Sequence, residues 1–224
     1  MTDKKSKVDS FVQFLSTEDH VTGGEISFYI DGLSNSGVRM LNTANFAVQY
    51  GEFQTDVREG ADETFIKGAI NTSSLFFVPL PFTDSYSRLL TTMRLQYSEQ
   101  AMPSFEQLSL GGPTGVRAFQ TGDFSADRAA YISNEWYFNL PAWQVSSNHT
   151  VNDVFQMGIL LDMAHGTQNG GFITDSGTVA ADDWAYMIAA GLVFKANWNS
   201  SFSSKVSIAT PVDAKSSLDP DSSG

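Results

Sequence analysis

Residues 154–165 read VFQMGILLDMAH, and this stretch decides the fold class. Its side chains alternate between two sets, a pattern typical of a β-strand whose two faces meet different surroundings. One set is apolar, and the opposite set contains the polar residues of the stretch, including Asp162. The apolar set is Phe155, Met157, Ile159, Leu161 and Met163, and the opposite set is Gln156, Gly158, Leu160, Asp162 and Ala164.

The same period of two recurs along most of the chain. Further strands are expected at 25–33, 44–55, 64–78, 88–98, 130–140, 184–198 and 202–210. This makes about eight strands of about 9–15 residues, whereas strands of ordinary globular proteins average about 5–6. Long strands with one apolar face are what a tilted strand needs to cross a bilayer. The pattern therefore favours an antiparallel transmembrane barrel, and a soluble β-sandwich stays open as the alternative.

Composition excludes several classes of function. The 224 residues contain 13 lysines and arginines against 25 acidic residues, which gives a net charge of −12, and no cysteine. Nucleic acid is not expected as a partner, because its phosphates bind clustered cations. Without cysteine there are no disulfides, thiolate metal sites or cysteine nucleophiles. No run of 18 apolar residues and no secretory signal peptide is present, so the chain is either cytosolic or an internal segment of an exported protein.

Candidate metal and catalytic residues do not form a recognisable motif. The three histidines, His20, His149 and His165, lie far apart in the sequence. The acidic residues Asp175, Asp182 and Asp183 lack the regular spacing of a calcium loop. No nucleophile elbow, phosphate-binding loop or dinucleotide fingerprint follows any expected strand. The sequence therefore predicts no metal, no cofactor and no enzymatic activity.

One connection is too long to be a turn. Residues 103–128 read PSFEQLSLGGPTGVRAFQTGDFSADR. A connection of this length in a compact domain is usually functional or disordered, and disorder is not expected because the segment has its own apolar anchors. These are Phe105, Leu108, Leu110, Val116, Phe119 and Phe124. Gly111, Gly112 and Gly115 would allow sharp turns that place Arg117 between apolar neighbours.

Four motifs, in this order and spacing, resemble the C-terminal barrel region of the two-partner secretion transporters, the haemolysin secretion and activation proteins. The matching residues are Ser109-Leu110-Gly111-Gly112, Val116-Arg117-Ala118-Phe119, Ala126-Asp127-Arg128-Ala129 with Asn134-Glu135, and Leu160-Leu161-Asp162-Met163-Ala164. The likeness extends over residues 25–210. Ala118, Ala129 and Ala164 stand where the family has glycine, and Leu160 where it has an aromatic residue.

The resemblance implies a structural role for each motif. The segment 103–128 is expected to fold into the barrel lumen, with Gly111, Gly112, Val116, Arg117, Ala118 and Phe119 forming its motif. Asp162 is expected to hold Arg117, because the strand pattern puts Asp162 on the polar face. Glu135, Asp127 and Arg128 are further candidate partners. Polar residues expected to line the lumen are Arg94, Gln96, Gln156 and Lys205.

The resemblance also implies a function. It points to a pore in the bacterial outer membrane that exports a partner exoprotein without ATP. The lipid bilayer, the exoprotein and periplasmic POTRA domains of the same full-length chain are the expected partners. The chain would then be about half a barrel at 25–210, preceded by a poorly ordered or partial strand at 1–24 and followed by a mobile polar tail at 211–224. A component that assembles barrel proteins, or a soluble β-sandwich binding module, is the alternative.

Overall fold

The structure, a computed structural model, describes most of the chain. The described residues are 6–16, 21–34, 39–53, 64–79, 86–138, 140, 143–146, 149–170, 181–199 and 202–218. Within these ranges no helix is long and apolar enough to cross a membrane.

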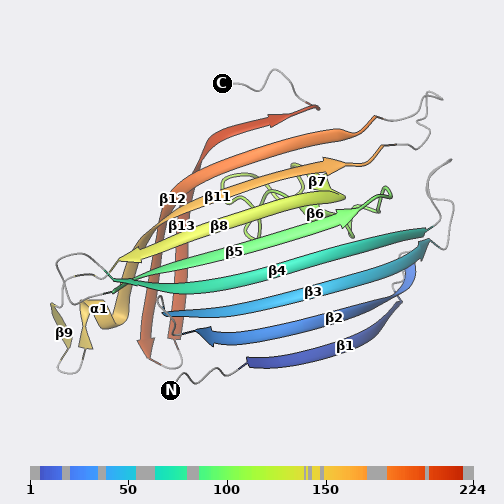
Figure 1. Cartoon of the computed structure of the whole chain (residues 1–224). Coiled ribbons are helices and arrows are strands. Elements are labelled where there is room, and N and C mark those ends of the chain that lie inside the picture. The colour runs from blue at the N-terminus through green and yellow to red at the C-terminus, as the bar shows by residue number, and fades with distance from the viewer. Residues whose placement is uncertain are drawn as a thin grey trace.

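Nine long strands form one antiparallel sheet in the order β1-β2-β3-β4-β5-β8-β11-β12-β13 (Figure 1). Their bounds are β1 Ser6–Ser16, β2 Val21–Ser34, β3 Arg39–Phe53, β4 Thr64–Pro79, β5 Tyr86–Ser98, β8 Arg128–Phe138, β11 Phe155–Gln168, β12 Asp183–Asn199 and β13 Phe202–Ser216. β1 and β13 are the outermost strands and do not pair with each other, so the described sheet is open.

The remaining elements are short. The two-residue strands β6 (Leu108–Ser109) and β7 (Ser125–Ala126) pair within the connection between β5 and β8. The strands β9 (Gln144–Ser146) and β10 (His149–Thr150) and the single turn α1 (Val151–Val154) lie between β8 and β11. This second group lies at the opposite end of the sheet from β6 and β7 (Figure 1).

The expected all-β antiparallel class is confirmed, and each of the eight expected strands is present. The long strands belong to one continuous sheet, whereas a sandwich requires two sheets packed face to face. The sandwich alternative is therefore wrong. A ninth strand, β1, occupies part of the range 1–24 that was expected to be poorly ordered or a partial strand.

The last strand extends beyond the expected end at residue 210 and includes the first six residues of the range expected as a mobile tail. Its register with β12 shifts between Ile188 and Ala189, which face Asp213 and Pro211 respectively. Val212 is therefore the extra residue of a β-bulge. Proline lacks the N–H of a regular ladder and is tolerated at bulges and sheet edges, so the strand continues past Pro211.

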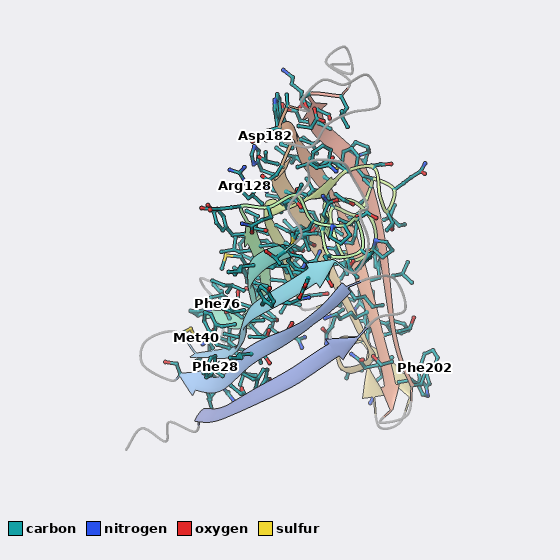
Figure 2. The ribbon with its side chains drawn as sticks, turned by 90° about the vertical axis from the view of Figure 1, so that its right-hand side faces the viewer. Phe28, Met40, Phe76, Arg128, Asp182 and Phe202 are labelled. Carbon is teal, nitrogen blue, oxygen red and sulfur yellow. The ribbon has the colours of Figure 1, made fainter. Side chains whose placement is uncertain are left out.

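The two faces of the sheet differ in their side chains. On the face we call outer, large apolar residues stay exposed, with Ile66 and Ile208 at 59% and 66%. Figure 2 shows Phe28, Met40 and Phe76 on this side of the curved sheet. On the other, inner face, the connection between β5 and β8 packs against β8, β11 and β12. An exposed apolar face of this size indicates a lipid or protein neighbour.

Candidate functional site

The connection between β5 and β8, residues 99–127, is called the inner loop. Its backbone is held by its own hydrogen bonds, including Leu110 N–H to the Phe124 carbonyl at 2.9 Å and Val116 N–H to the Leu110 carbonyl at 2.7 Å. Gly112 has a φ of 99°, and a Cβ there would lie 2.3 Å from Thr121 Oγ1. Glycine is therefore required at this turn for both conformation and space.

Apolar side chains attach the inner loop to the inner face of the sheet. Leu110 and Val116 are fully buried and Phe124 is nearly so. They form one apolar cluster with side chains of β8, β11 and β12. The buried sheet residues of this cluster are Ala129, Tyr131, Ala164, Ala185, Met187 and Ala189. Burial of this apolar area stabilises the loop in its position against the sheet.

At its tip, the inner loop presents Arg117 to two strands. The Arg117 backbone N–H donates to Asp162 Oδ2 at 3.1 Å, Nε donates to the same oxygen at 2.7 Å, and Nη2 donates to Asp162 Oδ1 at 2.8 Å. Nη1 donates to Glu135 Oε1 at 2.5 Å, and Nη2 also donates to Ser133 Oγ at 2.9 Å. Four residues, Arg117, Ser133, Glu135 and Asp162, make up what we call the Arg117 site.

The two carboxylates of the Arg117 site are removed from solvent, since Asp162 is 0% and Glu135 4% exposed. Hydrogen bonds to Asp162 raise the pKa of Arg117 further above its ordinary range, and those to Glu135 add to this effect. Arginine suits this position because its planar fork binds a carboxylate through two nitrogens. The pairing of a buried carboxylate with a loop cation makes the docked position of the loop specific.

Glu135 has two further partners that sequence reasoning did not assign to it. Lys205 Nζ on β13 lies 2.6 and 2.8 Å from its two oxygens, and the Tyr137 hydroxyl donates to Oε2 at 2.5 Å. Lys205 was expected only to line the lumen. Its alternation on β13 places it on the inner face, but only the cross-strand register brings its amine to Glu135.

Other polar residues of the inner face also hold the loop. Arg94 donates to the Thr114 carbonyl and stacks over the Tyr131 ring at 4.8 Å. Gln96 Nε2 donates to the carbonyls of Glu106 and Ala126, both at 3.2 Å. Arg94 and Gln96 were expected to line a path, and the structure instead engages them with the loop backbone.

Asp127 and Arg128 lie in a separate group at the base of the inner loop. Asp127 is fully buried and accepts from Met102 N–H at 2.8 Å, Gln107 Nε2 at 3.1 Å and Asn169 N–H at 2.7 Å. These four residues make up what we call the Asp127 site. Arg128 Nε donates to Asn169 Oδ1 at 2.7 Å. Arg128 also contacts Asp182 at 3.3 Å, and both residues are labelled in Figure 2.

This placement corrects the grouping of Asp127 and Arg128 with the partners of Arg117. Both residues precede or begin β8, whereas Ser133 and Glu135 lie further along it. A strand rises about 3.4 Å per residue, so Arg128 is roughly 17 Å from Ser133 along the strand. The structure brings Arg117, Glu135 and Asp162 together, and it engages Asp127 and Arg128 with other partners.

The three alanines at family glycine positions lie around the apolar cluster. Ala129 and Ala164 are buried members of it, and Ala118 packs against it from the loop. Their methyl groups therefore add contacts within the interface between the loop and the sheet. Among the described residues, no group of three or more His, Asp or Glu side chains is arranged to hold a metal ion.

Comparison with known proteins identifies the family. Residues 8–171 match the family model described as haemolysin secretion/activation protein ShlB/FhaC/HecB. The outer membrane transporter CdiB of Dickeya dadantii (strain 3937) is 36% identical over 106 residues, which cover 46% of this chain and 18% of that protein. These are secretion and transport proteins rather than enzymes. The chain therefore belongs to the ShlB/FhaC/HecB family of haemolysin secretion/activation proteins, and its location is the bacterial outer membrane.

Proposed function

We propose that this chain forms part of an outer-membrane pore that exports a partner exoprotein by two-partner secretion. The inner loop would close or narrow the lumen, and its release would open the path. The observation that carries this proposal is the Arg117 site, in which one loop side chain joins β8 and β11 across the inner face. Transport would need no ATP, because the exported chain gains free energy by folding outside the cell.

The chemistry of the Arg117 site supports a reversible closure. Breaking one partner out of a buried ion pair costs about 3–5 kcal/mol, since the other charge is left without compensation. That cost is large enough to keep the loop docked and small enough for binding of an exoprotein to overcome. Polar groups of the inner face would then meet water or the exported chain.

The remaining partners follow from the two faces and edges of the sheet. The exposed apolar side chains of the outer face would contact lipid. β1 and β13 have unpaired edges among the described strands, and further strands of a longer chain would complete the barrel. Periplasmic POTRA domains of that longer chain would recognise the exoprotein and trigger release of the inner loop.

The proposal is tested by Arg117→Ala in the complete transporter that carries this chain. Removing the guanidinium leaves Asp162 and Glu135 without their shared cation, so the docked state should weaken by about 3–5 kcal/mol. We expect an altered single-channel conductance in planar bilayers and a changed secretion of the exoprotein, because the docked state that closes the path would be less populated. Arg117→Lys should have an intermediate effect, because lysine keeps the charge but lacks the fork.

The control for this experiment is Lys215→Ala. Lys215 is an exposed cation of β13 that pairs with Tyr186, whose chain neighbours Ala185 and Met187 are buried on the inner face. It therefore lies on the outer face, and its loss should change neither secretion nor conductance. If Arg117→Ala secretes and conducts like the unmodified transporter, the loop does not gate the pore through Arg117.

A further inference from the structure

Two cations of the inner face share one carboxylate. Glu135 Oε1 accepts from Arg117 Nη1 at 2.5 Å and lies 2.6 Å from Lys205 Nζ, which also contacts Oε2 at 2.8 Å. Arg117 comes from the inner loop, whereas Lys205 comes from β13, three strands away from β8. The same oxygen therefore serves one cation that would leave with the loop and one that would stay with the sheet.

The two carboxylates would be left in different states if the loop left. All the hydrogen bonds that the Asp162 carboxylate accepts from described residues come from Arg117. Glu135 would retain Lys205 and the Tyr137 hydroxyl. Release of the loop would therefore leave the charge on Asp162 without a cation, while the charge on Glu135 would remain neutralised.

Other charged groups sharpen this asymmetry. The direct register partner of Lys205 on β12 is Lys195, another cation, whose amine lies 4.1 Å from the centre of the Tyr137 ring. Repulsion between the two lysines favours contact of Lys205 with Glu135. In the docked state Lys205 also repels Arg117, since both cations bind the same oxygen.

We propose that Lys205 is a positioning residue that favours release of the inner loop. It competes with Arg117 for Glu135 in the docked state and neutralises Glu135 in the released state. Removing its charge should therefore tighten docking, although it removes two hydrogen bonds. This inference rests on the proposed gating by the inner loop. It identifies Lys205 as a residue that lowers the free energy needed to release the loop.

The chain offers a direct way to measure release. It contains no cysteine, and Val116 at the loop tip is fully buried. Val116→Cys therefore places a single thiol where only release of the loop exposes it, with little change in side-chain volume. The rate of alkylation by a maleimide, measured on the full chain in detergent micelles, reports the released fraction.

In the Val116→Cys background, Lys205→Met should slow alkylation by about twofold to fivefold, the range expected for a partly exposed ion pair. Arg117→Met should accelerate it strongly. When Arg117 is already replaced, Lys205→Met should no longer slow alkylation, because the competition has been removed. Lys205→Arg, which keeps the charge, and Lys215→Met, on the outer face, should both match the parent rate.

The opposite sign overturns the proposal. Faster alkylation in Lys205→Met would show that Lys205 supports docking as an ordinary partner. Slowing that persists without Arg117 would show that Lys205 does not act by competing with Arg117 for Glu135. Lys205→Gln repeats the test if the methionine variant does not fold, and circular dichroism checks folding of each variant.

A secretion assay separates this inference from the proposed function. In the complete transporter, Lys205→Met should lower secretion although every contact of Arg117 with Asp162 is retained. Slower alkylation together with unchanged secretion would support the role of Lys205 in docking and would contradict gating by the loop.

Discussion

The inner loop is attached at two places, and the two attachments use different chemistry. At the Arg117 site, a loop cation meets two carboxylates of the sheet, and the partners are about 16–45 residues apart in sequence. At the Asp127 site, a buried carboxylate accepts two backbone N–H groups and one side-chain amide, and none of its three donors is charged.

This difference indicates different roles for tip and base. In a charge pair, the cation can be replaced by another cation or by water. The loop tip can therefore leave the sheet while the carboxylates keep a partner. The donors at the Asp127 site are mostly backbone groups that no exported chain can replace, since they belong to the segments next to β5 and β11. We therefore expect the loop to move at its tip and to remain fixed at its base.

At the base of the loop, the largest effect is expected from Asp127→Ala. It leaves the buried N–H groups of Met102 and Asn169 without their acceptor, at a cost of about 3 kcal/mol in local stability. Hydrogen exchange of these two amides should accelerate by roughly a hundredfold. Alkylation of Val116→Cys should stay near the parent rate if tip and base are independent. A large increase in alkylation would mean that both attachments open as one unit.

A medium effect is expected from Gly112→Ala at the turn before the tip. The residue has a φ of 99° and a Cβ would meet Thr121, whereas Gly122 has a φ of 88° with no atom within 4 Å of its Cβ position. Both alanine variants carry the penalty of a left-handed backbone, about 1 kcal/mol, and only Gly112→Ala adds the clash. Thermal unfolding should show Gly112→Ala to be the less stable variant. Equal stability would show that the turn relaxes away from Thr121.

The smallest effect concerns pH. Because hydrogen bonds to Asp162 raise the folded pKa of Arg117 above its ordinary value, the contribution of Arg117 to docking is complete below that ordinary value and is lost only when the pH rises through the higher folded pKa. Docking should therefore be equal at about pH 7 and about pH 9. The measurement is the alkylation rate of Val116→Cys divided by that of an exposed cysteine, Thr114→Cys, at the same pH. A ratio that rises with pH would show that another group titrates within the Arg117 site.

The sequence predicted the sheet well because alternation is a local property. Successive residues of a strand such as β11 face two different surroundings in turn. The resulting alternation of apolar and polar residues can be read from the sequence without knowing which strands lie beside it. The side on which Asp162 lies follows from the same pattern. The segment of β1 was predicted only as a partial or poorly ordered strand. The end of β13 was predicted too early, because a proline such as Pro211 usually ends a strand.

Contacts of individual side chains were harder to predict because they depend on register. Lys205 and Glu135 lie 70 residues apart, and their meeting requires the alignment of β8, β11, β12 and β13 together. The donors to Asp127 are two backbone N–H groups and one side-chain amide. Nearly every residue type has a backbone N–H, so the sequence does not indicate which of them donates to Asp127. A sequence pattern therefore identifies the charged residues of a site more readily than it identifies their partners.

The position of the inner loop between β5 and β8 has a consequence for the order of folding. Closing this connection of 29 residues costs about 2 kcal/mol more in chain entropy than closing a two-residue hairpin turn. We therefore expect β1–β5 and the long strands β8, β11, β12 and β13 to pair first, as two separate ladders. Pairing of β5 with β8 should follow later. Ser133, Glu135 and Asp162 all belong to the second ladder. Once this ladder has formed, the binding partners of Arg117 are in place before the inner loop docks.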